Sequence, residues 1–151
     1  MRVFLQRCKS SRVEVDGKVV GSIASGLMLL VGFTHNDSSK EIDYMVDKII
    51  NLRVFDDCNG VMNKSLLDVG GSILSVSQFT LYAVCSKGRR PSYSKALGGK
   101  EAKVLYQEFN NKLRMHNINV EEGVFGAEME VFLVNDGPIS MMVSKESDVN
   151  E

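Results

Sequence analysis

The spacing of apolar side chains predicts strands at the start of the chain. Apolar and polar residues alternate in MRVFLQRCK (1–9) and SRVEV (11–15), and the apolar pattern continues in KVVGSI (18–23) and GLMLLVGFT (26–34). A period of two is typical of strands with one buried face. Asp16-Gly17 joins two of these runs and predicts a hairpin turn, because Asp and Gly tolerate positive φ.

The period then changes to that of a helix. Ser38 and Glu41 have the spacing of a capping box, in which the two residues exchange hydrogen bonds at the start of a helix. Apolar residues follow at helical spacing on Ile42, Met45, Val46, Ile49 and Ile50. A second amphipathic helix is predicted within residues 98–117, with a core face on Ala102, Leu105, Tyr106, Phe109 and Leu113.

Strands are predicted again between and after the helices. Residues 52–63 indicate a strand that enters an Asn-Gly turn, and residues 72–84 indicate one long apolar strand after Gly70-Gly71. In VNDGP (134–138), Asn, Asp and Gly between two apolar runs predict a hairpin. Pro138 is unexpected there, because proline has no N–H for a strand ladder.

These elements favour an α+β fold. Many strands accompany two helical blocks, and we expect no β-α-β alternation, so the prediction is one domain with a curved, mainly antiparallel, barrel-like sheet and two main helices. We expect the domain to span residues 1–144. Residues 145–151 are predicted to form a frayed polar tail.

Composition narrows the class of protein. The chain has 151 residues, of which 44% are hydrophobic, and its net charge of -1 does not indicate a general nucleic-acid binder. The longest apolar run, LMLLV, is too short to span a bilayer, and the start of the chain lacks the apolar core of a signal peptide. Cys8, Cys58 and Cys85 are expected to be reduced, since their spacing matches neither a metal motif nor a disulfide framework. A cytoplasmic protein without membrane contact is therefore expected.

Familiar catalytic motifs are missing from the sequence. It contains no GxxxxGK[ST], GxGxxG or HExxH pattern. His35 and His116 are interpreted as structural, because neither has a Cys or carboxylate at ligand spacing, and no metal site or cofactor is predicted. A serine-histidine-aspartate triad stays open, because its members can lie far apart in the chain.

Two local features carry candidate chemistry. Residues 84–100 hold Lys87, Arg89, Arg90, Lys95 and Lys100 without any acidic residue. Such a segment either contacts phosphates or is an ordinary solvated loop. If residues 77–81 form a strand, Gln78 and Thr80 lie on one face and interrupt an otherwise apolar run. These polar groups either belong to a functional site or are satisfied within an ordinary core strand.

Taken together, these motifs resemble those of the D-aminoacyl-tRNA deacylase family of the bacterial and eukaryotic type. The resemblance rests on SVSQFTLYA, KGRRPSYS and FGAEMEVFLVNDGP, together with MRVFLQRC, DKIINLRVF and MNKSLLDVGG. It runs from Met1 to about Val143. It implies hydrolysis of the ester bond of D-aminoacyl-tRNA in the proofreading of translation, with glycyl-tRNA also accepted, and no cofactor.

The resemblance also assigns roles at two motifs. Gly137-Pro138 would be cis, and each subunit of a homodimer would insert it into its partner's active site, where its carbonyls accept a D-residue and exclude an L-residue. Ser77, Gln78, Phe79 and Thr80 would form the catalytic part, with main-chain N–H groups near Phe79 and Thr80 as oxyanion donors. Thr80 is interpreted as orienting rather than nucleophilic, because the substrate's ribose carries a hydroxyl beside the ester.

Further residues match the family's substrate-binding segments. Arg7 would brace the Gly-Pro loop. Without the resemblance, Arg7 is interpreted as a surface charge at a strand edge. Phe125 and Met129 would line the adenosine pocket, although either also suits a core position. Lys87, Arg89 and Arg90 would lie near the tRNA end. The alternative function is a non-catalytic nucleic-acid-binding protein that uses the basic 87–100 loop.

Overall fold

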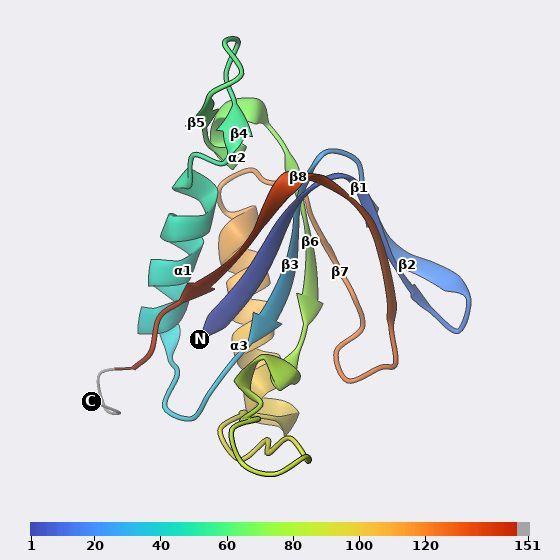
Figure 1. Cartoon of the computed structure of the whole chain (residues 1–151), viewed down its shortest axis with the longest axis vertical. Coiled ribbons are helices and arrows are strands. Elements are labelled where there is room, and N and C mark those ends of the chain that lie inside the picture. Colours follow the sequence, from blue (N-terminus) through green and yellow to red (C-terminus); the bar gives the residue numbers. More distant parts are fainter. Residues whose placement is uncertain (148–151) are drawn as a thin grey trace.

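The computed structural model describes residues 1–147. Its main sheet has six strands in the order β2-β1-β3-β6-β7, and β8 pairs with β1. The strands are β1 (Arg2–Val15), β2 (Lys18–Ile23), β3 (Gly26–Gly32), β6 (Ser72–Ser77), β7 (Val120–Glu122) and β8 (Glu130–Ser144). The sheet curves until it is nearly closed into a barrel (Figure 1), as the sequence predicted.

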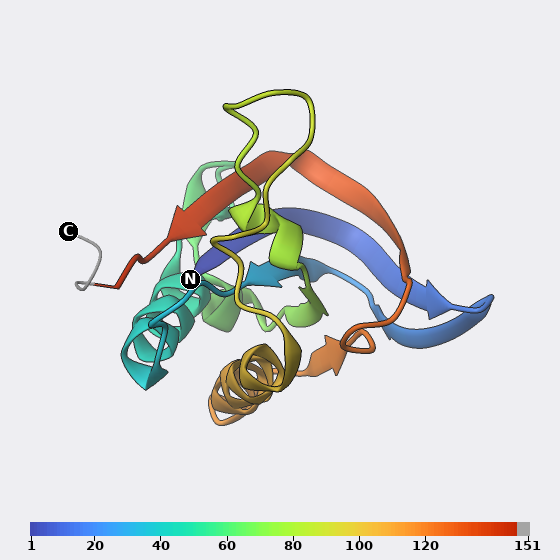
Figure 2. The same cartoon turned by 90° about the horizontal axis from the view of Figure 1, so that it is seen from below.

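The remaining elements are helices and one small hairpin. The helices are α1 (Ser39–Asn51), α2 (Leu66–Val69), α3 (Gly99–Arg114) and the 3-10 helix η1 (Phe79–Tyr82). β4 (Phe55–Asp56) and β5 (Met62–Lys64) form a separate antiparallel pair. Figures 1 and 2 show α1 and α3 side by side on one face of the sheet, where the predicted apolar faces of both helices are buried in the core.

The expected absence of β-α-β alternation is wrong. β3 pairs with β6 and β6 pairs with β7, both in parallel, and α1 and α3 lie in the two connections. β1 pairs antiparallel with β2, β3 and β8. The sheet is therefore mixed, and the two parallel pairings explain why both helices cover the same face, since such crossovers share one handedness.

The Asp16-Gly17 hairpin and the capping box are both confirmed. Asp16 and Gly17 have φ values of 51° and 76°, which is the left-handed region that such a tight turn requires. The backbone N–H of Ser38 donates to Glu41 at 2.8 Å, and the Ser38 side chain accepts from the first turn of α1. These signals act over a few residues, so tertiary packing does not override them.

The long strand predicted over residues 72–84 ends early. β6 stops at Ser77, and the chain turns into η1, where Leu81 N–H donates to Gln78 O and Ala83 N–H donates to Thr80 O. The expected alternation of faces from Ser77 to Leu81 is therefore wrong. The strand ends here because the Gln78 N–H makes the last hydrogen bond to β3, to Val31 O at 2.8 Å. Beyond it, the backbone hydrogen bonds form within the turn instead of between strands.

The hairpin predicted at VNDGP is also wrong. β8 runs straight through it, and both of its halves pair antiparallel with β1. The register shifts between Gln6 and Ser10, so residues 136–139 bulge out of the ladder instead of reversing the chain. The Asn135 side chain stabilises this bulge by donating to Arg7 O at 3.0 Å and Ile139 O at 3.1 Å.

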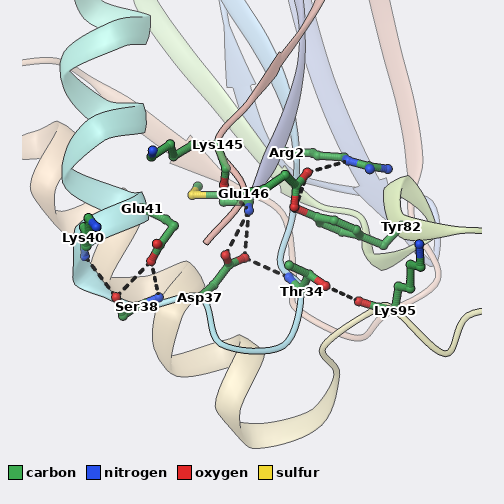
Figure 3. Close-up of polar contacts among 11 residues, drawn as sticks. Arg2, Thr34, Asp37, Ser38, Lys40, Glu41, Tyr82, Lys95, Lys145 and Glu146 are labelled. Atoms are coloured by element: carbon green, nitrogen blue, oxygen red, sulfur yellow. Dashed lines mark hydrogen bonds and ion pairs between the residues drawn. The ribbon is translucent and has the colours of Figure 1, made fainter. Parts of the chain in front are cut away.

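The two ends of the described chain lie together. The terminal ammonium of Met1 donates to Asp37 Oδ1 at 3.0 Å and to Lys145 O at 2.8 Å, and Lys145 N–H returns a bond to Met1 O at 2.9 Å (Figure 3). Residues 145–147 of the predicted tail thus hold defined positions. Residues 148–151 lie outside the described residues.

Candidate active site

The end of β6 and the turn after it form the first part of the site. Ser77 and Gln78 are half-buried where β6 meets η1, and the Phe79 side chain is 52% exposed. Gln78 Nε2 donates to Thr80 Oγ1, so the two side chains support each other across the turn. This is the only hydrogen bond given for the Thr80 hydroxyl within residues 1–147, and no basic group is its partner.

The turn presents backbone donors. Phe79 and Thr80 occupy the first positions of η1, where N–H groups have no partner inside the helix itself. Neighbouring N–H groups in such a turn can stabilise an oxyanion, and they need no reorganisation when the negative charge develops. The turn therefore offers two backbone donors, and no side-chain base accompanies the Thr80 hydroxyl.

A cavity of about 520 Å³ opens beside this turn. Ser77, Gln78 and Phe79 line one side, and Phe125 and Met129 from the β7–β8 connection line another. The structure thus brings together two segments that the sequence separates by nearly fifty residues. This volume lies within the range of sites that bind small molecules.

Phe125 is held from behind by the protein core. Its ring centroid lies 5.8 Å from that of Tyr106, whose hydroxyl donates to Ser75 O at 2.7 Å. Burial raises the pKa of Tyr106, so this side chain stays neutral and acts as a fixed support. Phe125 therefore serves both the core and the cavity, and the two roles considered for it are compatible.

Sequence reasoning missed the start of α3 as part of the cavity. Gly98 and Gly99 line the cavity, and Gly98 is the N-cap of α3 without a side-chain capping bond. Helix N-termini favour anionic groups because their first N–H groups are unpaired. The Gly-Gly pair before the helix was the available signal, but it does not show which surface the helix end will face.

The basic segment lies next to the cavity. It leaves η1, forms a bridge between Val84 and Ser92, and returns along the end of β3 (Figure 2). Lys87, Arg89 and Arg90 are exposed on it. Tyr93 contacts Phe79 edge to face at a centroid distance of 5.2 Å, which joins the loop to the turn that follows β6. Lys100 belongs to α3 rather than to the loop.

Gly137 and Pro138 do not line the cavity of their own chain. Their peptide bond is cis. Arg7 braces this segment: its Nε donates to Asp136 O at 3.0 Å, and its Nη1 donates to Val54 O at 2.7 Å. Val54 directly precedes β4, and Figure 1 shows the β4–β5 hairpin at the opposite end of the molecule from η1.

Arg7 is therefore not a surface charge. Its relative exposure is 6%, and its guanidinium also lies 3.5 Å from both Asp56 and Asp136 carboxylates. A buried guanidinium with charged and carbonyl partners fixes the backbone around it. Arg7 thus contacts the chain beside Gly137-Pro138 through Asp136, and its part in the function of that segment stays a prediction.

The two histidines and the three cysteines do not line the cavity. His35 contacts Ser94 O at 2.9 Å in the loop before α1, and His116 follows α3. Within residues 1–147, no group of three His, Cys, Asp or Glu side chains is arranged to hold a metal ion. In the same range, none of the helices has the length and apolar character needed to cross a membrane. The three cysteines are free, with Cys8 buried and Cys58 and Cys85 exposed.

Comparison with known proteins identifies the family. The sequence profile of D-Tyr-tRNA(Tyr) deacylase matches residues 4–144. A D-aminoacyl-tRNA deacylase of Clostridium tetani is 55% identical over 146 residues, which is 97% of this chain and 98% of the relative. The chain belongs to the D-Tyr-tRNA(Tyr) deacylase family. The resemblance seen in the motifs and the expectation of an enzyme of this family are thereby confirmed.

Other similar proteins agree on this deacylase fold. A D-aminoacyl-tRNA deacylase of Thermosipho africanus is 53% identical over 97% of this chain and 98% of its own. The solved structure of a protein named c-Myc DNA Unwinding Element Binding Protein superposes with a TM-score of 0.91 at 36% identity, covering 97% of this chain and all of that one. A probable eukaryotic D-amino acid tRNA deacylase superposes with a TM-score of 0.81 at 19% identity, which shows a shared fold.

Proposed function

We propose that this protein hydrolyses the ester bond of D-aminoacyl-tRNA and releases the free D-amino acid and tRNA. One observation carries the proposal: in a chain of the deacylase family, one cavity joins the Ser77-Gln78-Phe79 turn to Phe125 and Met129. Phe125 and Met129 would contact the terminal adenosine, which leaves the aminoacyl ester beside the turn. The reaction removes misacylated tRNA before translation and would take place in the cytoplasm.

The chemistry needs an oxyanion site more than it needs a nucleophile. Water attacks the ester carbonyl, the N–H groups of Phe79 and Thr80 stabilise the oxyanion, and the carbon–oxygen bond to the ribose breaks. The released ribose oxygen takes up a proton, and the amino acid leaves as its carboxylate. The neighbouring ribose hydroxyl would orient the water, while Gln78 and Thr80 keep the turn in shape.

Stereochemical selection is assigned to Gly137-Pro138 acting in a homodimer. Within one subunit this segment lies beside β4, away from the cavity, so it would reach only the site of a partner subunit. Its carbonyls would accept the α-amino group of a D-residue, and an L side chain would meet the main chain. Glycyl-tRNA would be hydrolysed too, because glycine has no side chain to exclude.

The basic loop would bind the tRNA end. Lys87, Arg89 and Arg90 are exposed on the segment whose Tyr93 contacts Phe79, and there they can pair with backbone phosphates. The second candidate function, nucleic-acid binding without catalysis, would use the same loop. It is favoured by the structural similarity to a protein named for binding a DNA element.

The variant Gly137→Ala separates these two functions. A Cβ at this position would lie 3.0 Å from the Ile139 backbone nitrogen and 3.2 Å from Asn135 Oδ1, so the segment must shift. We expect hydrolysis of D-tyrosyl-tRNA to fall at least about 10-fold, because the reacting geometry depends on tight placement. Binding of uncharged tRNA, measured by filter retention, should remain unchanged. A wild-type protein that binds tRNA but never hydrolyses the ester would favour the binding function.

A further inference from the structure

Arg2 contacts the catalytic turn from outside the cavity. Its Nη1 donates to Leu81 O at 3.0 Å, and its Nε donates to Glu146 Oε1 at 3.1 Å. The guanidinium carbon also lies 4.4 Å from the centroid of the Tyr82 ring (Figure 3). Leu81 and Tyr82 are the last two residues of η1, so Arg2 holds the end of the helix that begins with the two oxyanion donors.

Tyr82 anchors the same turn from the inside. Its side chain is 2% exposed, and its hydroxyl donates to Glu146 Oε2 at 3.2 Å. Burial raises its pKa, so Tyr82 remains a neutral donor to this carboxylate. Arg2, Tyr82 and Glu146 thus form a closed set of contacts, which we call the turn clamp.

Both charged members of the turn clamp lie outside the matched family region. The family profile covers residues 4–144, whereas Arg2 precedes it and Glu146 follows it. Main-chain bonds between Met1 and Lys145, at 2.8 Å and 2.9 Å, hold these two segments side by side. The contacts are therefore part of the fold of this chain and not a chance meeting of two long side chains.

We propose that Arg2 is a positioning residue for the deacylation reaction and acts by fixing η1 through the turn clamp. The inference rests on the proposed function, because it assigns catalytic importance to the Phe79 and Thr80 N–H groups. Arg2 does not itself line the cavity, although its backbone pairs with Gly32, which does. Loss of its bond to Leu81 O would let η1 tilt, and oxyanion donors lose effect quickly when they are misplaced.

The test compares Arg2→Met with Arg12→Met. Arg12 offers a matched control, because its Nε lies 3.2 Å from Glu14 and its guanidinium lies 3.9 Å from the Phe132 ring, far from η1. For Arg2→Met we expect kcat on D-tyrosyl-tRNA to fall about 10-fold with KM within about 2-fold. Arg2→Lys should recover part of the loss, since one ammonium can reach either Leu81 O or Glu146 but not both in the same geometry.

Amide hydrogen exchange supplies a readout that does not depend on activity. Peptides that cover residues 77–83 should exchange faster in Arg2→Met and in Glu146→Gln than in the wild type, while peptides from α1 keep their rates. Arg12→Met should leave both unchanged. The combined Arg2→Met, Glu146→Gln variant should be no worse than either single change, because the two residues act as one unit.

Two results separate the failure of this inference from failure of the proposed function. If the wild type hydrolyses D-tyrosyl-tRNA and Arg2→Met matches Arg12→Met in kcat and exchange, the turn clamp does not position the site. If the wild type has no activity, the proposed function fails. The exchange rates still test the turn clamp in that case, because unchanged exchange over residues 77–83 in Arg2→Met would overturn it. A global loss of stability, with faster exchange in α1 as well, would also contradict a local positioning role.

Discussion

Arg7 shows how much a single side chain contributes around the Gly137-Pro138 segment. It is buried and joins β1 to the bulge of β8 and to the chain before β4. Removal of the guanidinium leaves the buried carbonyl of Val54 and the partly buried carbonyl of Asp136 without their donor. Such unsatisfied groups are costly, because burial has already removed the water that would replace the donor.

We therefore predict that Arg7→Met lowers the free energy of unfolding by about 2 to 3 kcal/mol and reduces D-deacylation. Urea unfolding followed by circular dichroism measures the first effect, and ester hydrolysis measures the second. Arg12→Met, which alters an exposed arginine, should change stability by no more than about 0.5 kcal/mol. Equal effects of the two substitutions would show that the brace is unimportant.

Cys8 differs from the other two cysteines in its surroundings. Burial raises the pKa of its thiol to about 11, and the thiol donates to Gly26 O at 3.6 Å. A thiol reagent at pH 8 should therefore modify the exposed Cys58 and Cys85 quickly and Cys8 only after unfolding.

The same shift gives the sign of a pH dependence. The folded-state pKa of Cys8 lies above the unfolded value of about 8.5, so its contribution to stability is present below that pH and declines as pH rises toward 11. Unfolding of wild type and Cys8→Ala across this range measures the effect. Equal labelling rates for all three thiols in the folded protein would contradict the buried assignment.

At the scale of elements, the sequence predicts features that depend on neighbouring residues, but not those that depend on contacts with distant strands. The capping box and the two amphipathic helices were predicted because each depends on residues a few positions apart. η1 was missed because a four-residue 3-10 helix inside an apolar run has no period of its own. The bulge at residues 136–139 cannot be predicted locally, because Asn-Asp-Gly suits both a hairpin and a bulge and only the distant β1 decides between them.

The capping box of α1 permits a quantitative prediction. Burial raises the pKa of Glu41, but hydrogen bonds from the Ser38 backbone and hydroxyl outweigh this and lower it overall. Ser38→Ala removes the side-chain part of the box and should cost about 1 kcal/mol at pH 7. The neighbouring Ser39→Ala, which loses only an exposed contact with Glu108, is the control.

The pH dependence of this effect has a defined direction. Because the folded-state pKa of Glu41 is lowered, its contribution is present above the unfolded value and is lost as pH falls through the folded one. The stability difference between wild type and Ser38→Ala should thus shrink in acid. A difference that stays constant from pH 7 to pH 3 in urea titrations would argue against the ionised capping box.

At the scale of the whole molecule, the two sequence motifs lie apart. The Ser77-Gln78-Phe79 turn opens into the cavity at one end, and Gly137-Pro138 is braced at the other, beside β4. The resemblance of the motifs predicts both as site residues, and their separation within one chain is a property of the folded sheet. The cavity's Gly98-Gly99 wall likewise depends on where α3 begins relative to β3, which no local pattern gives.

Action of Gly137 in a partner subunit predicts complementation between two inactive variants. Gln78→Ala disturbs the turn, and Gly137→Ala disturbs the selecting segment. After co-refolding in equal amounts, half of the dimers are mixed and each carries one intact composite site, so about a quarter of wild-type activity should return. No recovery, despite mixed dimers detected by native mass spectrometry, would place Gly137 and the turn in the same subunit.

The central claim is deacylation that depends on the handedness of the amino acid. The most direct measurement is the rate of hydrolysis of D-tyrosyl-tRNA beside the same tRNA charged with L-tyrosine, with purified protein and a metal chelator present. We expect release of D-tyrosine at least about 100-fold faster than release of L-tyrosine. Equal rates for the two esters, or no release from either while the tRNA stays bound, would contradict it.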